Sequence, residues 1–162
     1  MNAVPHEFNA FFAGDQILVL IVATTVIIII HGFGMLATIG IAGSFDKWII
    51  RHQALRYGVG TLIVASLIII TVHFLEVIVW ALLFCWSGAI PNVSDSFYFS
   101  TLQYVTVGST YNLPFRWRNL EGAIAMTGLL TFAWSTGVLM TLVSEFQNQI
   151  VQSMTQRRSR KC

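Results

Sequence analysis

Three long apolar runs constrain the fold of this chain more than any other feature. They cover residues 17–41, 58–86 and 120–146. An α-helix rises about 1.5 Å per residue, so each run can cross the roughly 30 Å hydrocarbon layer of a bilayer. A backbone in that layer must satisfy its own hydrogen bonds, and a helix does so internally. The runs predict an all-α membrane protein with three transmembrane helices.

The composition narrows the classes of function. Hydrophobic residues make up 56% of the chain and charged residues only 10%, whereas a soluble domain carries about 25% charged residues. The length leaves no room for a soluble enzyme domain beside the spans, so we expect no enzymatic activity. A net charge of +2 gives no reason to expect a nucleic-acid partner. The expected surroundings are a lipid bilayer.

The basic residues predict the orientation of the chain. Cytoplasmic loops of membrane proteins carry an excess of Lys and Arg. With three spans, seven of the nine basic residues fall on one side: Lys47, Arg51, Arg56, Arg157, Arg158, Arg160 and Lys161. We therefore expect a multi-pass protein of the cell membrane, with its N-terminus outside and its C-terminus cytoplasmic. Four tryptophans lie near the expected membrane interfaces, as in an aromatic belt: Trp48, Trp80, Trp86 and Trp117.

The segment between the second and third spans predicts a re-entrant loop. Pro91 breaks the chain after the second span, and Ser94 and Asp95 predict an N-cap and a first helical turn. Residues 96–105 are semi-apolar and too short to span, which is typical of a re-entrant helix. A short segment of small and polar residues follows this helix: Thr106, Val107, Gly108, Ser109 and Thr110.

Irregular backbone at membrane depth requires a cavity or protein around it. Carbonyl groups that point into such a cavity can replace the water shell of a cation. Thr106 can add its hydroxyl, and Gly108 permits backbone angles that a side chain forbids. The C-terminal end of the short helix carries partial negative charge, which favours a cation nearby.

The run FYFSTLQYVTVGST, between two spans, resembles the pore loop of the potassium-channel superfamily. The resemblance covers residues 58–146, which it marks as a pore domain between an N-terminal part (1–57) and a basic tail (147–162). It implies a homotetramer with the third span lining the inner cavity, and no cofactor other than permeant K+ or Na+ in the filter. Gly128 lies where such channels carry a hinge glycine, and Gly137 is a second candidate. The alternative is that both glycines serve close helix packing.

The sequence departs from the potassium pattern after Gly108. The usual run is TVGYG followed by Asp, but Ser109 replaces the Tyr and Thr110 replaces the second Gly. Losing the bracing ring and the second glycine predicts a wider outer filter, similar to those of weakly selective cation channels. The leading interpretation is passive, weakly selective conduction of monovalent cations. The alternatives are a potassium-selective channel and a non-conducting subunit with the channel fold.

Ionisable residues inside the spans mark the remaining candidates. His73 and Glu76 are three residues apart on one helical face, and such groups in a span indicate function by default. They could support the filter or take part in gating, or could staple helices together. His31 and His73 lie at similar depths in antiparallel spans, so they could pair or both meet Glu76. A metal site or bis-His haem at His31 and His73 stays an alternative, in a membrane redox or metal-binding protein built on these histidines and Glu76. The primary expectation is no resident metal.

Overall fold

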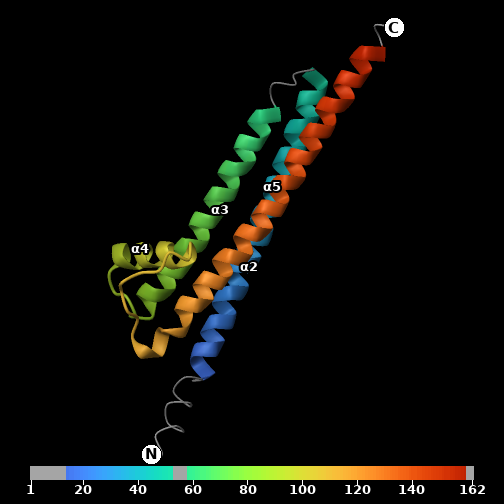
Figure 1. Cartoon of the computed structure of the whole chain (residues 1–162). Coiled ribbons are helices and arrows are strands. Elements are labelled where there is room, and N and C mark those ends of the chain that lie inside the picture. Colours follow the sequence, from blue (N-terminus) through green and yellow to red (C-terminus); the bar gives the residue numbers. More distant parts are fainter. Residues whose placement is uncertain (1–13, 53–57, 160–162) are drawn as a thin grey trace, which may run out of the picture. The chain divides into compact units, whose positions relative to one another are not determined.

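The computed structural model describes residues 14–52 and 58–159, and in these residues the protein is helical without strands. Figure 1 shows the elements in chain order. Their bounds are α2 (Gly14–His52), α3 (Gly58–Trp86), α4 (Val93–Tyr104), the 3-10 turn η2 (Phe115–Trp117) and α5 (Asn119–Ser159).

Three of the described helices are long and apolar enough to cross a membrane. The candidate spans are Gln16–Ser44, Val59–Trp86 and Phe115–Gln152. The expectation of an all-helical chain with three helices of this kind is confirmed for the described residues. α3 begins and ends where its apolar run does, whereas α5 continues well beyond residue 146 to Ser159. Three of the basic residues used for the orientation lie outside the described residues: Arg56, Arg160 and Lys161.

The chain divides into two compact units, and α2, α3 and α5 each contribute to both. The first, here called the α4 unit, holds the described residues 14–31 and 73–132. The second, here called the three-helix unit, holds the described residues 32–52, 58–72 and 133–159. Each has its own cluster of buried apolar side chains.

In the α4 unit, aromatic side chains pack α4 against the C-terminal part of α3. The rings of Phe84 and Phe99 meet edge to face, with centroids 5.3 Å apart, and Trp80 stacks on Phe84. The Ser96 hydroxyl donates to the Ala81 carbonyl at 2.6 Å. Trp80 is fully buried, so placing it in an interfacial belt was wrong, because it faces the core and not lipid headgroups.

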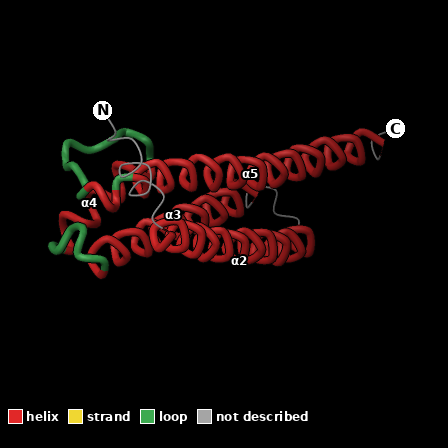
Figure 2. The backbone as a smooth tube through the Cα atoms, turned by 90° about the horizontal axis from the view of Figure 1, so that it is seen from below, coloured by secondary structure: helices red, strands yellow, loops and turns green. Residues whose placement is uncertain are grey.

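The start of α4 differs from the sequence-based expectation. Its N-cap is Asn92, whose side chain accepts hydrogen bonds from the backbone N–H groups of Ser94 and Asp95. Ser94 and Asp95 therefore lie in the first turn, and the prediction of a cap at Ser94 was wrong. An Asn side chain serves as well as Ser in this role. Figure 2 shows the loops that flank α4 on either side.

Small residues contribute to the helix packing of the three-helix unit. Ala42, Ala65 and Leu142 form its buried cluster. Gly34 packs so closely on Val72 that a Cβ at Gly34 would overlap the valine methyl groups. Lipid tails are as apolar as the side chains, so helices in a membrane associate mainly through close van der Waals packing. Small residues allow this packing because they let the helix backbones approach closely.

Candidate functional site

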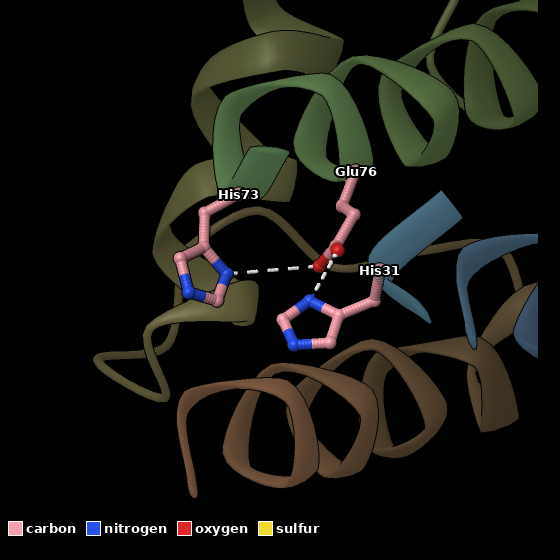
Figure 3. Close-up of side chains that lie close together, drawn as sticks. All are labelled: His31, His73 and Glu76. Carbon is pink, nitrogen blue, oxygen red and sulfur yellow. Dashed lines mark hydrogen bonds and ion pairs between the residues drawn. The ribbon is translucent and has the colours of Figure 1, made fainter. Parts of the chain in front are cut away.

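A buried polar cluster in the α4 unit joins all four of its α-helices. His31 comes from α2, His73 and Glu76 from α3, Tyr104 from the last position of α4, and Thr131 from α5. Figure 3 shows both imidazole rings directed toward the Glu76 carboxyl group. His31 and Glu76 are fully buried, and Tyr104 is 1% exposed. Burying polar groups so deeply costs free energy unless they are hydrogen-bonded to one another.

The Glu76 carboxyl group is the centre of the cluster. His31 Nδ1 lies 2.8 Å from Glu76 Oε1, and His73 Nδ1 lies 3.7 Å from Glu76 Oε2. The Tyr104 hydroxyl donates a hydrogen bond to Oε2. The two histidine rings are 5.5 Å apart between centroids. The structure thus brings together His31, His73 and Glu76, the three ionisable residues that the sequence singled out in the spans.

The Tyr104 hydroxyl has two further partners, His73 Nδ1 at 2.8 Å and Thr131 Oγ1 at 2.6 Å. A phenol has one proton, and here it goes to Glu76. The bond to His73 therefore requires a proton on the histidine Nδ1. Burial, together with the bond to Glu76, raises the pKa of Tyr104 above its ordinary value. The residue stays a neutral donor, and it fastens the end of α4 to α3 and α5.

α4 ends immediately after this cluster in a Schellman turn. The Thr106 N–H donates to the Gln103 carbonyl at 2.9 Å, and the Val107 N–H donates to the Leu102 carbonyl at 3.0 Å. In this motif the residue at Thr106 takes the left-handed conformation, usually as glycine. Thr106 has φ 61°, and among the described residues it alone has a positive φ without being glycine. A β-branched side chain there stores local strain, which is typical of functional sites.

The residues predicted as a filter follow this turn. Thr106, Val107, Gly108 and Thr110 are exposed, Val107 by 73%, and Ser109 is half-buried. Gly108 has φ 81°, so it uses the backbone freedom expected of it.

Tyr111 fixes the far end of this segment and was not recognised in the sequence. Its hydroxyl donates to the Ala89 carbonyl at 3.3 Å, and its ring meets Phe99 of α4 edge to face at 5.9 Å. Its N–H donates to Ser109 Oγ at 3.1 Å. An aromatic brace is therefore present, two residues after the position where the potassium pattern has its tyrosine.

The two candidate hinge glycines differ in their surroundings. A Cβ on Gly128 would overlap the backbone carbonyl oxygen of Tyr104, whereas a Cβ on Gly137 would meet nothing within 4 Å. Gly128 thus lets α5 approach the end of α4. Gly137 lies in the three-helix unit, along a hollow of about 540 Å³ lined also by Trp134, Thr141 and Glu145.

His31, His73 and Glu76 are also the group whose side chains could hold a metal ion. One ligand atom from each lies within 4.8 Å of those of the other two. These are the same three residues on which the sequence-based alternative of a redox or metal-binding protein rests.

Tyr104 and Thr131 are further members of the cluster that the sequence did not reveal. Tyr104 directly precedes the expected filter, and its aromatic ring reads as an ordinary core residue. Thr131 follows Thr127 by four residues in a helix rich in small residues, which also suits helix packing. Only their position beside Glu76 distinguishes them.

No family model, curated protein or solved structure matches this chain.

Proposed function

We propose that the chain is one subunit of a homotetrameric pore-loop channel that conducts monovalent cations passively across the cell membrane with weak selectivity. The observation that carries the proposal is the segment 105–110, which is exposed apart from the half-buried Ser109 and is held at both ends by tyrosines. Tyr104 is tied to Glu76, His73 and Thr131, and Tyr111 to Ala89.

A fixed helix end followed by exposed irregular backbone suits cation binding. The end of α4 directs the negative end of its dipole toward this segment. Carbonyl oxygens of such a segment can replace the hydration shell of an ion when several copies surround it. Four chains around one axis, as the resemblance to the potassium-channel superfamily implies, would supply those copies.

Large apolar side chains on the candidate spans agree with a membrane-embedded assembly. Several are more than half exposed in the single chain: Leu18, Ile21, Val22, Ile29, Phe33, Leu36, Val59, Ile63, Leu67, Ile70, Phe74, Leu82, Met126, Leu129, Leu130 and Met140. Lipid or neighbouring subunits can cover such faces. The proposed orientation has the N-terminus outside and the C-terminus in the cytoplasm, as the Lys and Arg distribution predicts.

A potassium-selective pore is the second candidate, and Tyr111 is the observation that favours it. The expectation of weak selectivity rests on the loss of an aromatic brace at Ser109. Tyr111 braces the same segment from a different position through Phe99 and Ala89.

Cation flux from liposomes containing the purified protein tests both candidates. Potassium or sodium is supplied as the only permeant cation, and native mass spectrometry reports the number of chains. We expect flux of both ions through a tetramer. Flux of potassium alone would select the second candidate. Absence of both fluxes, beside an active control channel, would contradict conduction.

A matched pair of variants connects the flux to the filter segment. Gly108→Ala forces a side chain into the left-handed region, at a cost of about 1–2 kcal/mol, and we expect it to abolish most of the flux. Gly60→Ala adds the same methyl group in α3, where nothing lies within 4 Å, and flux should be retained. Equal flux in the two variants would show that conduction does not depend on this segment.

A further inference from the structure

The cluster of His31, His73 and Glu76 has the composition and spacing of a metal site. We infer that these three side chains form a binding site for a divalent transition-metal cation, with Zn2+ as the best-matched ion. Imidazole nitrogen and carboxylate oxygen are the ligands that Zn2+ takes in sites with three protein ligands. Mg2+ and Ca2+ prefer sets made of oxygen alone.

The observed distances are close to those of a tetrahedral ion. Metal–ligand bonds of about 2.0–2.1 Å place neighbouring ligand atoms about 3.3 Å apart. In the structure, His31 Nδ1 lies 2.8 Å from Glu76 Oε1, and His73 Nδ1 lies 3.7 Å from Glu76 Oε2. The two distances, which lead to different oxygens of one carboxylate, lie on either side of this value, and ligand atoms of all three residues lie within 4.8 Å of one another.

Proton positions allow the exchange of hydrogen bonds for metal bonds. On metal binding, the proton on His73 Nδ1 would move to Nε2 and the bond from His73 to Tyr104 would be given up, so that each neutral imidazole presents its Nδ1 lone pair to the ion. Tyr104 and Thr131 then remain as outer partners, because the Tyr104 hydroxyl bonds Glu76 Oε2 and Thr131 Oγ1. Such outer hydrogen bonds orient the ligands of metal sites and are part of their affinity.

The bound ion would cross-link two helices, α2 and α3. His31 belongs to α2, whereas His73 and Glu76 belong to α3. All three side chains are buried, so the ion would be shielded from bulk water, with one bound water as the fourth ligand of the tetrahedral site. The site depends only on the geometry of the α4 unit and not on whether the chain conducts ions.

The test uses the full chain, purified without an affinity tag and freed of metal with a chelator. Co2+ serves as the spectroscopic probe and Zn2+ as the competitor. We expect about one Co2+ per chain, with the intense visible absorption of a tetrahedral site, displaced by Zn2+. His31→Gln and His73→Gln should each weaken binding by more than about tenfold.

The other two histidines of the chain, His6 and His52, supply the matched control. The double variant His6→Gln, His52→Gln should bind Co2+ like the unchanged protein. Gel filtration and helical circular dichroism identify any variant that fails to fold. The inference is overturned if the unchanged protein binds no Co2+. It is equally overturned if folded His31→Gln and His73→Gln proteins keep the full absorption, or if only the control variant loses it.

Discussion

The hydroxyl oxygen of Tyr104 makes the polar contacts that hold the end of α4 in place. Its hydroxyl meets Glu76, His73 and Thr131, which come from two other helices. The next turn of chain contains Thr106, whose backbone is strained. At the scale of single residues, the fully hydrogen-bonded Tyr104 therefore lies two positions before the strained Thr106, and each residue can be tested by its own substitution.

Removing the Tyr104 hydroxyl should destabilise the fold. Tyr104→Phe leaves the ring in place but removes a buried donor to Glu76, which costs about 1–3 kcal/mol. For a chain of this size we expect the midpoint of thermal unfolding in detergent to fall by about 2–4 °C per kcal/mol. Tyr98→Phe is the control on the same helix, because Tyr98 is 66% exposed. Equal midpoints for the two variants would contradict the anchoring role.

Relieving the backbone strain at Thr106 should raise the stability of the fold, whereas loss of the Tyr104 hydroxyl should lower it. Glycine fits the left-handed position of a Schellman turn, so Thr106→Gly should stabilise the fold by about 1 kcal/mol. Val105 has φ −86°, and Val105→Gly should destabilise by about 0.5–1 kcal/mol because glycine there only adds freedom to the unfolded chain. Thermal unfolding of both variants checks the signs. A destabilised Thr106→Gly protein would show that the threonine side chain contributes more than its strain costs.

At the scale of elements, the contact between α4 and α5 depends on a position without a side chain. Gly128 faces the Tyr104 carbonyl with no space for a Cβ. The close approach also places Thr131 of α5 within hydrogen-bonding distance of Tyr104. A single helix crossing therefore positions both the packing and the polar cluster.

A methyl group at this crossing should force α4 and α5 apart. We expect Gly128→Ala to destabilise the protein by about 1–3 kcal/mol, the usual cost of overpacking. Gly137→Ala, on the same helix with open space around it, should be neutral or stabilising by up to about 1 kcal/mol, because alanine favours helix. Unfolding midpoints of the pair distinguish a packing glycine from a hinge. Tolerance of Gly128→Ala equal to that of Gly137→Ala would remove the packing role.

At the scale of the whole molecule, the proposed topology of three spans places the two ends of the chain on opposite sides of a membrane. The distribution of Lys and Arg predicts that the C-terminal side is cytoplasmic. The chain carries its own reporter of this side, since one of its two cysteines is the last residue, Cys162.

Cysteine labelling in intact cells tests the orientation. In the Cys85→Ser variant, Cys162 should react with a membrane-impermeant maleimide only after the membrane is permeabilised. In a companion protein with Cys85→Ser, Cys162→Ser and Asn112→Cys, the new thiol in the exposed loop after Gly108 should react without permeabilisation. The reversed pattern in the two proteins would invert the proposed orientation.

The sequence alone determined the features that depend on local properties. Helix length and apolar content along the chain predicted the candidate spans, and the bounds of α3 agree with its run. The short helix between two spans followed from its length and from the breaker at Pro91. Counting residues from the span ends also put His31 and His73 at similar depth, since the rise of a helix is constant.

Only the tertiary structure decided which side chains meet. The spans are apolar on all sides, so their pattern marks no inward face, and the rotation of each helix is set by its packing partners. That rotation buries Trp80, directs Glu76 to Tyr104 and brings Tyr111 onto Phe99. The cap at Asn92 and the turn at Thr106 join near neighbours in the chain, so they belong to the local features, although the cap was expected at Ser94. The contacts of Glu76 with Tyr104 and of Tyr111 with Phe99 join residues distant in the chain, and no local pattern encodes them.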